Sequence, residues 1–211
     1  TAVGDLFGGD VRIGDAATAA GFLASAGDYR ILHLATHAQA RSTVGDLSYL
    51  AFSQPADSSG EAFVYLRDLY LQRLRAELVV LSACETSAGE YRMGEGMVSL
   101  AKGFFHAGVR SVVATLWSVD DAKNADLMLR FFQRIKKGDP KDAALRTAKL
   151  NYLNAHPHDE AHPVYWAAAV AVGDMQPVDL NGVGGWWKLI ALAIVAAVIV
   201  QQVIRRLRPT K

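Results

Sequence analysis

The feature that most constrains the fold is an apolar run, Leu78–Leu81, which is rich in branched side chains and is followed by a polar turn. Such a run predicts a strand buried on both faces of a parallel sheet. The single cysteine of the chain, Cys84, follows it. A thiol at the carboxyl end of a buried strand lies where open α/β sheets bind ligands and carry out chemistry. Free cysteines are also often buried, so position alone leaves an inert core role open.

A second buried-strand pattern lies upstream, over Ile31–Ala35, and it also leads to a residue capable of acid–base chemistry, His37. His37 precedes Cys84 by 47 positions (84 minus 37), which is enough for the crossover that two parallel strands require. If the two strands are neighbours, their carboxyl ends bring imidazole and thiol to one edge of the sheet. A histidine beside a cysteine generates or stabilises the thiolate, which is the reactive form.

Length and composition are those of one α/β domain. The 211 residues can enclose a sizeable core, and the net charge of +1 does not indicate a nucleic-acid-binding surface. One cysteine excludes an intramolecular disulfide and a multi-thiolate metal site. The sequence does not begin with Met and opens within apparently folded chain, so we expect it to be a piece of a longer protein.

Helical and strand patterns alternate along the chain, which predicts a mostly parallel sheet covered on both faces. The expected helices cover residues 15–27 (with Asp15 as cap), 65–74, 93–107, about 120–137 and 141–154. The further expected strands cover residues 110–117 and 164–172. Residues 39–62 indicate a long loop with a short hairpin at 49–53.

The composition changes after residue 180, and we divide the chain into a domain (1–180), a linker (181–185), a transmembrane helix (186–204) and a basic tail (205–211). The unbroken apolar run Leu189–Val200 is too short to cross a hydrocarbon core of about 30 Å. Counted from Trp186 to Ile204, the segment is long enough, and a packing helix is the alternative. Because Lys- and Arg-rich ends stay cytoplasmic, we expect a single-pass membrane protein with a cytoplasmic C-terminus and an extracytoplasmic domain.

Several stretches together resemble the CHAT-domain family, caspase-like cysteine peptidases often found behind tetratricopeptide repeats. In family order, the matching stretches are 31–37 (ILHLATH), 78–86 (LVVLSACET), 94–101 (GEGMVSLA), 108–117 (GVRSVVATLW), 165–168 (YWAA) and 173–174 (GD). The resemblance implies a three-layer caspase-like sandwich around a mostly parallel sheet, with the front portion of the domain missing here. It also implies a protein or peptide substrate and tetratricopeptide repeats upstream in the parent chain. We expect no cofactor and no nucleic acid.

The resemblance assigns catalytic roles residue by residue. Cys84 is the nucleophile and His37 the general base and acid of a Cys–His dyad. The backbone N–H groups of Cys84 and Ala38 form the oxyanion hole. Where the family commonly has glycine, this chain has Ala38 and Ser87. The alternative to an active endopeptidase is therefore an inactive relative that serves as a membrane-tethered interaction or scaffold module.

Two further groups of residues bear on the site. Asp120 and Asp121 follow the strand expected at 110–117. They lie in a Leu-Trp sequence context similar to that of separases, in which an acidic residue binds a basic P1 side chain of the substrate. The resemblance thus implies that Asp121, together with Asp120, selects Arg or Lys at P1, although aspartate at a helix start is also an ordinary cap. Histidines at positions 156, 158 and 162 are clustered, but nearby prolines restrict how their rings converge, and we expect no bound metal.

Overall fold

The structure is a computed structural model, and it describes residues 2–39, 48–54, 62–82 and 95–180. The chain divides into two compact units, residues 1–178 and 179–211. The helices and strands that the structure describes all belong to the first unit.

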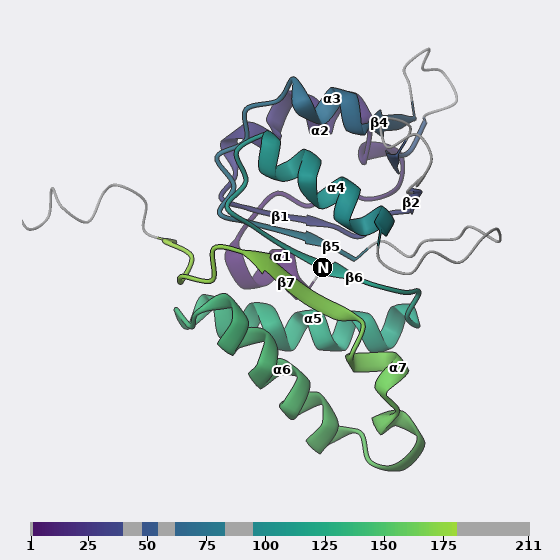
Figure 1. The fold of residues 1–211 in the computed structure, drawn as a ribbon, viewed down its shortest axis with the longest axis vertical. Coiled ribbons are helices and arrows are strands. Elements are labelled where there is room, and N and C mark those ends of the chain that lie inside the picture. The colour runs from purple at the N-terminus through teal and green to yellow at the C-terminus, as the bar shows by residue number, and fades with distance from the viewer. Residues whose placement is uncertain (1, 40–47, 55–61, 83–94, 181–211) are drawn as a thin grey trace, which may run out of the picture. The chain divides into compact units, whose positions relative to one another are not determined.

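A four-stranded sheet with the order β1-β5-β6-β7 lies at the centre of this unit (Figure 1). Its strands are β1 (Ile31–Leu34), β5 (Leu78–Leu81), β6 (Ser111–Thr115) and β7 (Ala169–Gly173). The first three are parallel, and β7 is antiparallel to β6. The architecture is therefore mixed α/β with a mostly parallel sheet.

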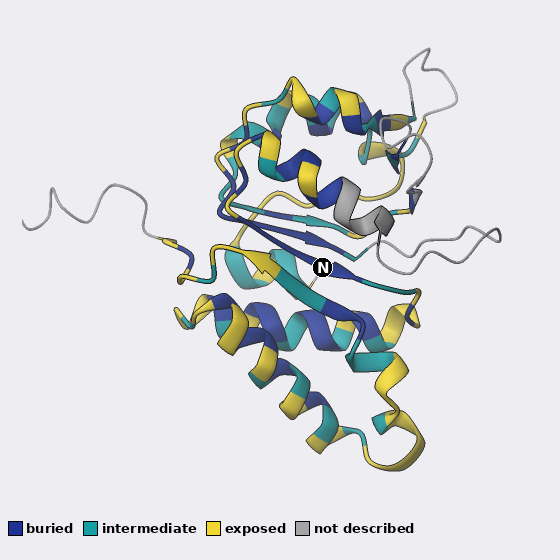
Figure 2. Cartoon of the chain, viewed as in Figure 1, coloured by how far each residue is buried: buried dark blue, intermediate teal, exposed yellow. Residues whose placement is uncertain are grey.

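Helices cover both faces of this sheet (Figure 1). They are α1 (Ala2–Phe7), α2 (Ala19–Ser25), α3 (Leu66–Tyr70), α4 (Glu95–His106), α5 (Asp121–Lys136), α6 (Lys141–Ala155) and α7 (Pro163–Trp166), with 3-10 turns η1 (Gly14–Ala16), η2 (Ala26–Asp28) and η4 (His158–Ala161). Val79 and Leu81 of β5 belong to a core shared with α2, α3 and α4. Leu78 and Val80 belong to the opposite core, shared with α1, α5 and α6. All four residues of β5 are buried (Figure 2), which explains the uninterrupted apolar run in the sequence.

A smaller antiparallel sheet follows β1 in the chain. It has the order β2-β3-β4, with β2 (Ala38–Gln39), β3 (Tyr49–Ala51) and β4 (Phe63–Tyr65). The sequence analysis predicted only a long loop with a hairpin at 49–53 in this region. Strands of two or three residues are too short to show a period of two, so β2 and β4 were missed.

Several element boundaries differ from the expectation, including the helix expected over 65–74, which ends at Tyr70, and two elements begin later for an identifiable reason. The helix expected from residue 15 begins at Ala19, because the side chain of Thr18, not Asp15, accepts a hydrogen bond of 3.1 Å from the Gly21 N–H. The strand expected from residue 164 begins at Ala169, because Pro163 starts the helical turn α7.

The predicted transmembrane helix is corrected. Within the ranges that the structure describes, no helix is long and apolar enough to cross a membrane, and the predicted span (186–204) lies outside them. We therefore correct the fold class to a mixed α/β domain. The single-pass membrane location and its cytoplasmic C-terminus are withdrawn.

Candidate active site

Two neighbouring strands lead to the predicted catalytic residues. β1 pairs in parallel with β5, and the register joins Ile31 to Leu78 and Leu34 to Leu81. A backbone hydrogen bond of 3.0 Å from the Ser82 N–H to the Leu34 carbonyl continues the ladder. The carboxyl ends of β1 and β5 therefore meet at one edge of the sheet, on the right in Figure 1.

His37 lies three residues beyond β1, and its side chain is exposed. Its carbonyl accepts a hydrogen bond of 2.7 Å from the N–H of Ala51 in β3, so the smaller sheet also holds its backbone. Cys84 lies three residues beyond β5 in the sequence, and both it and Ser87 are outside the described residues. The structure thus places His37 at the expected edge, and its pairing with Cys84 stays a prediction.

Ala38, the predicted oxyanion-hole donor after the histidine, is buried in β2. Antiparallel pairs alternate between hydrogen-bonded and non-hydrogen-bonded. Because His37 and Ala51 form a hydrogen-bonded pair, Ala38 and Leu50 form the other kind, and the Ala38 N–H points away from β3. Among the described residues other than glycine, only His158 has a positive φ, so the backbone at Ala38 does not require glycine.

His33, in β1, has a hydrogen-bond partner that the sequence analysis did not identify. Nε2 of His33 lies 3.0 Å from Oγ of Ser82, directly after β5. The His33 ring packs against Phe132 of α5, with ring centroids 5.2 Å apart. Burial lowers the pKa of His33 to about 4, so the ring is neutral near pH 7. This bond joins the two strands just before the predicted catalytic residues.

Asp120 and Asp121 lie at the start of α5, after β6. Oδ1 of Asp120 accepts a hydrogen bond of 3.1 Å from the Lys123 N–H, so Asp120 is the N-cap of the helix. Asp121 is the first helical residue and is exposed. Because β6 is the other parallel neighbour of β5, both aspartates follow the same sheet edge as His37. The structure gives Asp120 a capping role and leaves the Asp121 side chain at the surface.

Among the clustered histidines, His156 lies between two carboxylates. In His156, Nε2 lies 2.9 Å from Oδ2 of Asp126 and Nδ1 lies 2.7 Å from Oε2 of Glu160. These hydrogen bonds, first to Asp126 and then to Glu160, raise the pKa of His156. Across the described part of the chain, no group of three or more His, Cys, Asp or Glu side chains is arranged to hold a metal ion.

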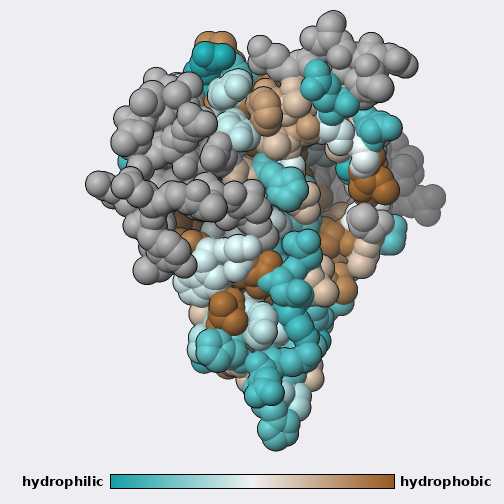
Figure 3. Space-filling view, turned by 90° about the vertical axis from the view of Figure 1, so that its right-hand side faces the viewer, coloured by the Kyte–Doolittle hydropathy of each residue, from teal (hydrophilic) through white to brown (hydrophobic). Residues whose placement is uncertain are grey.

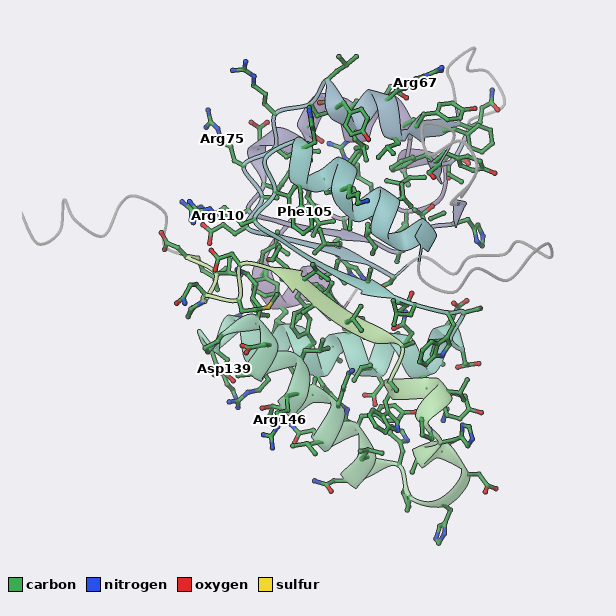
Figure 4. All side chains as sticks on the ribbon, in the orientation of Figure 1. Arg67, Arg75, Phe105, Arg110, Asp139 and Arg146 are labelled. Atoms are coloured by element: carbon green, nitrogen blue, oxygen red, sulfur yellow. The ribbon has the colours of Figure 1, made fainter. Side chains whose placement is uncertain are left out.

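The two ends of the parallel strands differ in character. At the amino end, the exposed side chains of Arg75 and Arg110 point away from the sheet (Figure 4). The side of the molecule that bears the carboxyl end shows apolar surface interspersed with polar surface (Figure 3). The candidate site therefore lies away from these arginines.

Comparison with known proteins shows the family to which the chain belongs. A mostly parallel sheet between two helical layers fits a caspase-like, peptidase-related fold. The family model of the CHAT domain matches residues 1–174, so the chain belongs to the CHAT-domain family. Over 113 residues it is also 28% identical to Tetratricopeptide repeat protein 28 of Mus musculus. That match covers 54% of this chain and only 4% of the mouse protein.

Acid is expected to destabilise the protein through His33. The pKa of His33 is about 4 in the folded protein against an ordinary value of 6.5, so between these values the unfolded state binds one more proton. The contribution of His33 to the free energy of unfolding is fully present above pH 6.5 and is lost as the pH drops toward 4. The expected loss from His33 is about 2–3 kcal/mol at pH 4.5. Urea unfolding at pH 7.0 and pH 4.5 measures it.

The variant His33→Gln isolates this effect, because glutamine can still hydrogen-bond to Ser82 but takes up no proton in this range. Its stability should fall less than that of the wild type between the two pH values. The matched control is His106→Gln, at an exposed position at the end of α4, which should retain the wild-type pH dependence. Equal losses in the wild type and His33→Gln would contradict the assignment.

Proposed function

We propose that this chain is a caspase-like cysteine endopeptidase domain in which Cys84 and His37 form the catalytic dyad. The observation that carries the proposal is the register of β1 and β5, in which each residue pairs with the one 47 positions later. His37 and Cys84 are separated by the same 47 positions, and each follows its strand by three residues. Two segments that leave neighbouring parallel strands with equal offsets begin side by side. This supports a contact between imidazole and thiol.

The proposed reaction is acyl transfer through a thioester. His37 takes the proton from Sγ of Cys84, and the thiolate attacks the scissile carbonyl carbon. The N–H groups of Cys84 and Ala38 donate hydrogen bonds to the oxyanion that forms. His37 then protonates the leaving amine, and the peptide bond breaks. Finally, a water molecule deprotonated by His37 hydrolyses the thioester and restores the dyad.

The described residues support these roles. The exposed His37 side chain is accessible to a substrate, while its backbone is held by β1 on one side and by β3 on the other. The Ala38 N–H points away from β3, toward the edge of the smaller sheet at which no other described strand pairs. A donor that is fixed in place and is not used by the neighbouring strand is what an oxyanion hole requires.

We propose a protein or peptide as the substrate, and tetratricopeptide repeats upstream in the parent protein as a regulatory partner. The support for the repeats is the similarity to a tetratricopeptide repeat protein. The dyad chemistry itself uses no cofactor, because the thiol, the imidazole and water supply every group that reacts.

Covalent labelling with a fluorescent acyloxymethyl ketone tests the dyad. The wild type should be labelled at one site, since Cys84 is the only cysteine, and Cys84→Ala should abolish labelling. Loss of the general base in His37→Ala should slow labelling by roughly 10²–10⁴-fold. The rates are measured by in-gel fluorescence, and intact-mass spectrometry confirms the stoichiometry.

His106→Ala, which removes an exposed histidine from α4, is the control and should be labelled at the wild-type rate. Labelling of His37→Ala at an unchanged rate would contradict the dyad. A folded wild type that is not labelled would instead favour an inactive interaction or scaffold module.

The variant Ala38→Pro tests the oxyanion hole. Proline removes the N–H, and a position whose N–H faces the open edge of a sheet tolerates it. Hydrolysis of a fluorogenic peptide should fall by roughly 10²–10³-fold. Alkylation of Cys84 by iodoacetamide, which forms no oxyanion, should keep its rate.

Gln39→Pro is the matched control for this variant. Gln39 and Tyr49 form the next hydrogen-bonded pair of the ladder, so this change should lower the stability. If Ala38→Pro slows hydrolysis and alkylation equally, the Ala38 N–H has no specific role in the oxyanion hole.

For substrate selection, we propose that Asp121 binds an Arg or Lys side chain at P1. In a panel of fluorogenic peptides that differ at P1, Asp121→Asn should lower kcat/KM for Arg and Lys by roughly 10–100-fold relative to Leu. Asp120→Asn keeps the helix cap and removes the charge, so it isolates any share of Asp120 in this selection. Asp120→Ala should instead lower the stability by about 1 kcal/mol. A wild-type preference for Leu or Asp at P1 would reject the proposal.

A further inference from the structure

We propose that one face of the smaller sheet binds an aromatic or large apolar side chain of an extended polypeptide substrate, next to an acidic residue of that substrate. The surface consists of Tyr49, Phe63 and Tyr65, and we call it the aromatic face. The inference rests on the proposed peptidase function and adds a substrate class to it.

Side-chain alternation separates the two faces of the smaller sheet. Ala38, Leu50 and Val64 are buried, with exposed fractions of 4%, 0% and 0%. Their neighbours along each strand point to the opposite face. On that face lie the residues of β3 and β4 that flank Leu50 and Val64, which are Tyr49, Ala51, Phe63 and Tyr65.

The three rings hold one another in fixed orientations. The centroids of Tyr49 and Phe63 are 4.6 Å apart, and those of Tyr49 and Tyr65 are 5.9 Å apart, both with edge-to-face geometry. Phe63 nevertheless remains 39% exposed. A rigid aromatic cluster presents apolar contact area at a low cost in side-chain entropy, which suits it to binding.

The register links this face to His37. His37 pairs with Ala51 through the 2.7 Å hydrogen bond, and Ala51 pairs with Phe63 across β3 and β4. Because strands lie about 4.8 Å apart, the backbones at His37 and Phe63 are about 10 Å apart, and Ala51 is the residue between them in the register. An extended peptide rises about 3.3 Å per residue. A side chain placed on Phe63 would thus be about three residues from the bond at which His37 acts.

Arg67 adds a positive charge at the border of the aromatic face. It extends from α3 near β4 (Figure 4), and its Cζ lies 4.9 Å from the centroid of the Tyr65 ring. Its side chain is 62% exposed, and its Nε lies 3.8 Å from Oδ1 of Asp68. An arginine that stacks on a ring keeps donors for a carboxylate. This charge therefore favours an acidic residue beside the apolar side chain.

A photocrosslinking experiment on the full chain tests whether the apolar side chain of the substrate binds at the aromatic face. The probe is a Gly/Ser peptide that carries benzoylphenylalanine followed by glutamate. Mass spectrometry should map its crosslinks to residues 48–54 and 62–67, and Phe63→Ser should lower the yield about tenfold. Leu71→Ser, which changes an apolar side chain that is 82% exposed at the end of α3, should not alter the yield. Crosslinks spread over other surfaces, or an unchanged yield in Phe63→Ser, would overturn the proposal.

A charge swap tests the acidic part of the proposal. Replacing the glutamate of the probe by lysine should lower the crosslink yield several-fold with the wild type. Arg67→Glu should reverse this preference, so that the lysine peptide gives the higher yield. If Arg67→Glu still prefers the glutamate peptide, the proposed partner chemistry is wrong.

Crosslinking needs no catalysis, so the aromatic face and the peptidase function can fail separately. Cys84→Ala should give the same crosslinks as the wild type. In the labelling experiment, a tryptophan three positions from the electrophile should accelerate wild-type labelling about tenfold, but not that of Phe63→Ser. Crosslinks without any labelling would support the aromatic face and reject the peptidase. Labelling without crosslinks would reject the aromatic face and support the dyad.

Discussion

Parallel pairing of β1 with β5 is the interaction on which the candidate site depends. β5 is buried on both faces, with Val79 and Leu81 in one core and Leu78 and Val80 in the other. If β5 slipped by one residue along β1, these two sets of side chains would exchange faces, and the packing of both helical layers would be disrupted. The register is therefore strongly specified, and so is the place at which both strands end.

The smaller sheet imposes a second constraint on the same edge. Only residues 35–37 separate β1 from β2, so His37 lies where the chain leaves one sheet and enters the other. Its carbonyl is already paired with Ala51, although the next strand begins only at Ala38. The backbone around the histidine is thus held from both directions. This arrangement positions a reacting group without restricting access to its side chain.

Which helices and strands could be predicted depended on the length of their apolar pattern in the sequence. The buried strand β5 and the long helices α5 and α6 follow from their own apolar spacing, whereas β2 and β4 form only because other parts of the chain pack beneath them. The start of α2 was predicted at Asp15, although Thr18 is also a good cap by residue type. Burial of Ala19 and Phe22 in the core selects Thr18. Local sequence does not contain such tertiary choices.

The candidate site, too, could be predicted only where local sequence determines it. The position of His37 after a buried strand could be predicted, because an apolar run followed by a histidine is visible in the sequence. The bond from His33 to Ser82 was missed, although a signal for it exists. With the 47-residue offset, His33 pairs with Val80, and Ser82 lies two residues further on the same face. That signal becomes usable only once the strands are known to be neighbours and in register.

His33 and His37 have the same side chain and lie four residues apart, yet their surroundings give them different properties. Packing against Phe132 keeps His33 neutral down to a pH of about 4, because charging it would require desolvation of an imidazolium in the core. Its bond to Ser82 therefore remains in one protonation state throughout the neutral range. His37 is exposed at the edge that a substrate would reach. One histidine can thus hold the two strands together without competing for the proton that, in the proposed mechanism, the other transfers.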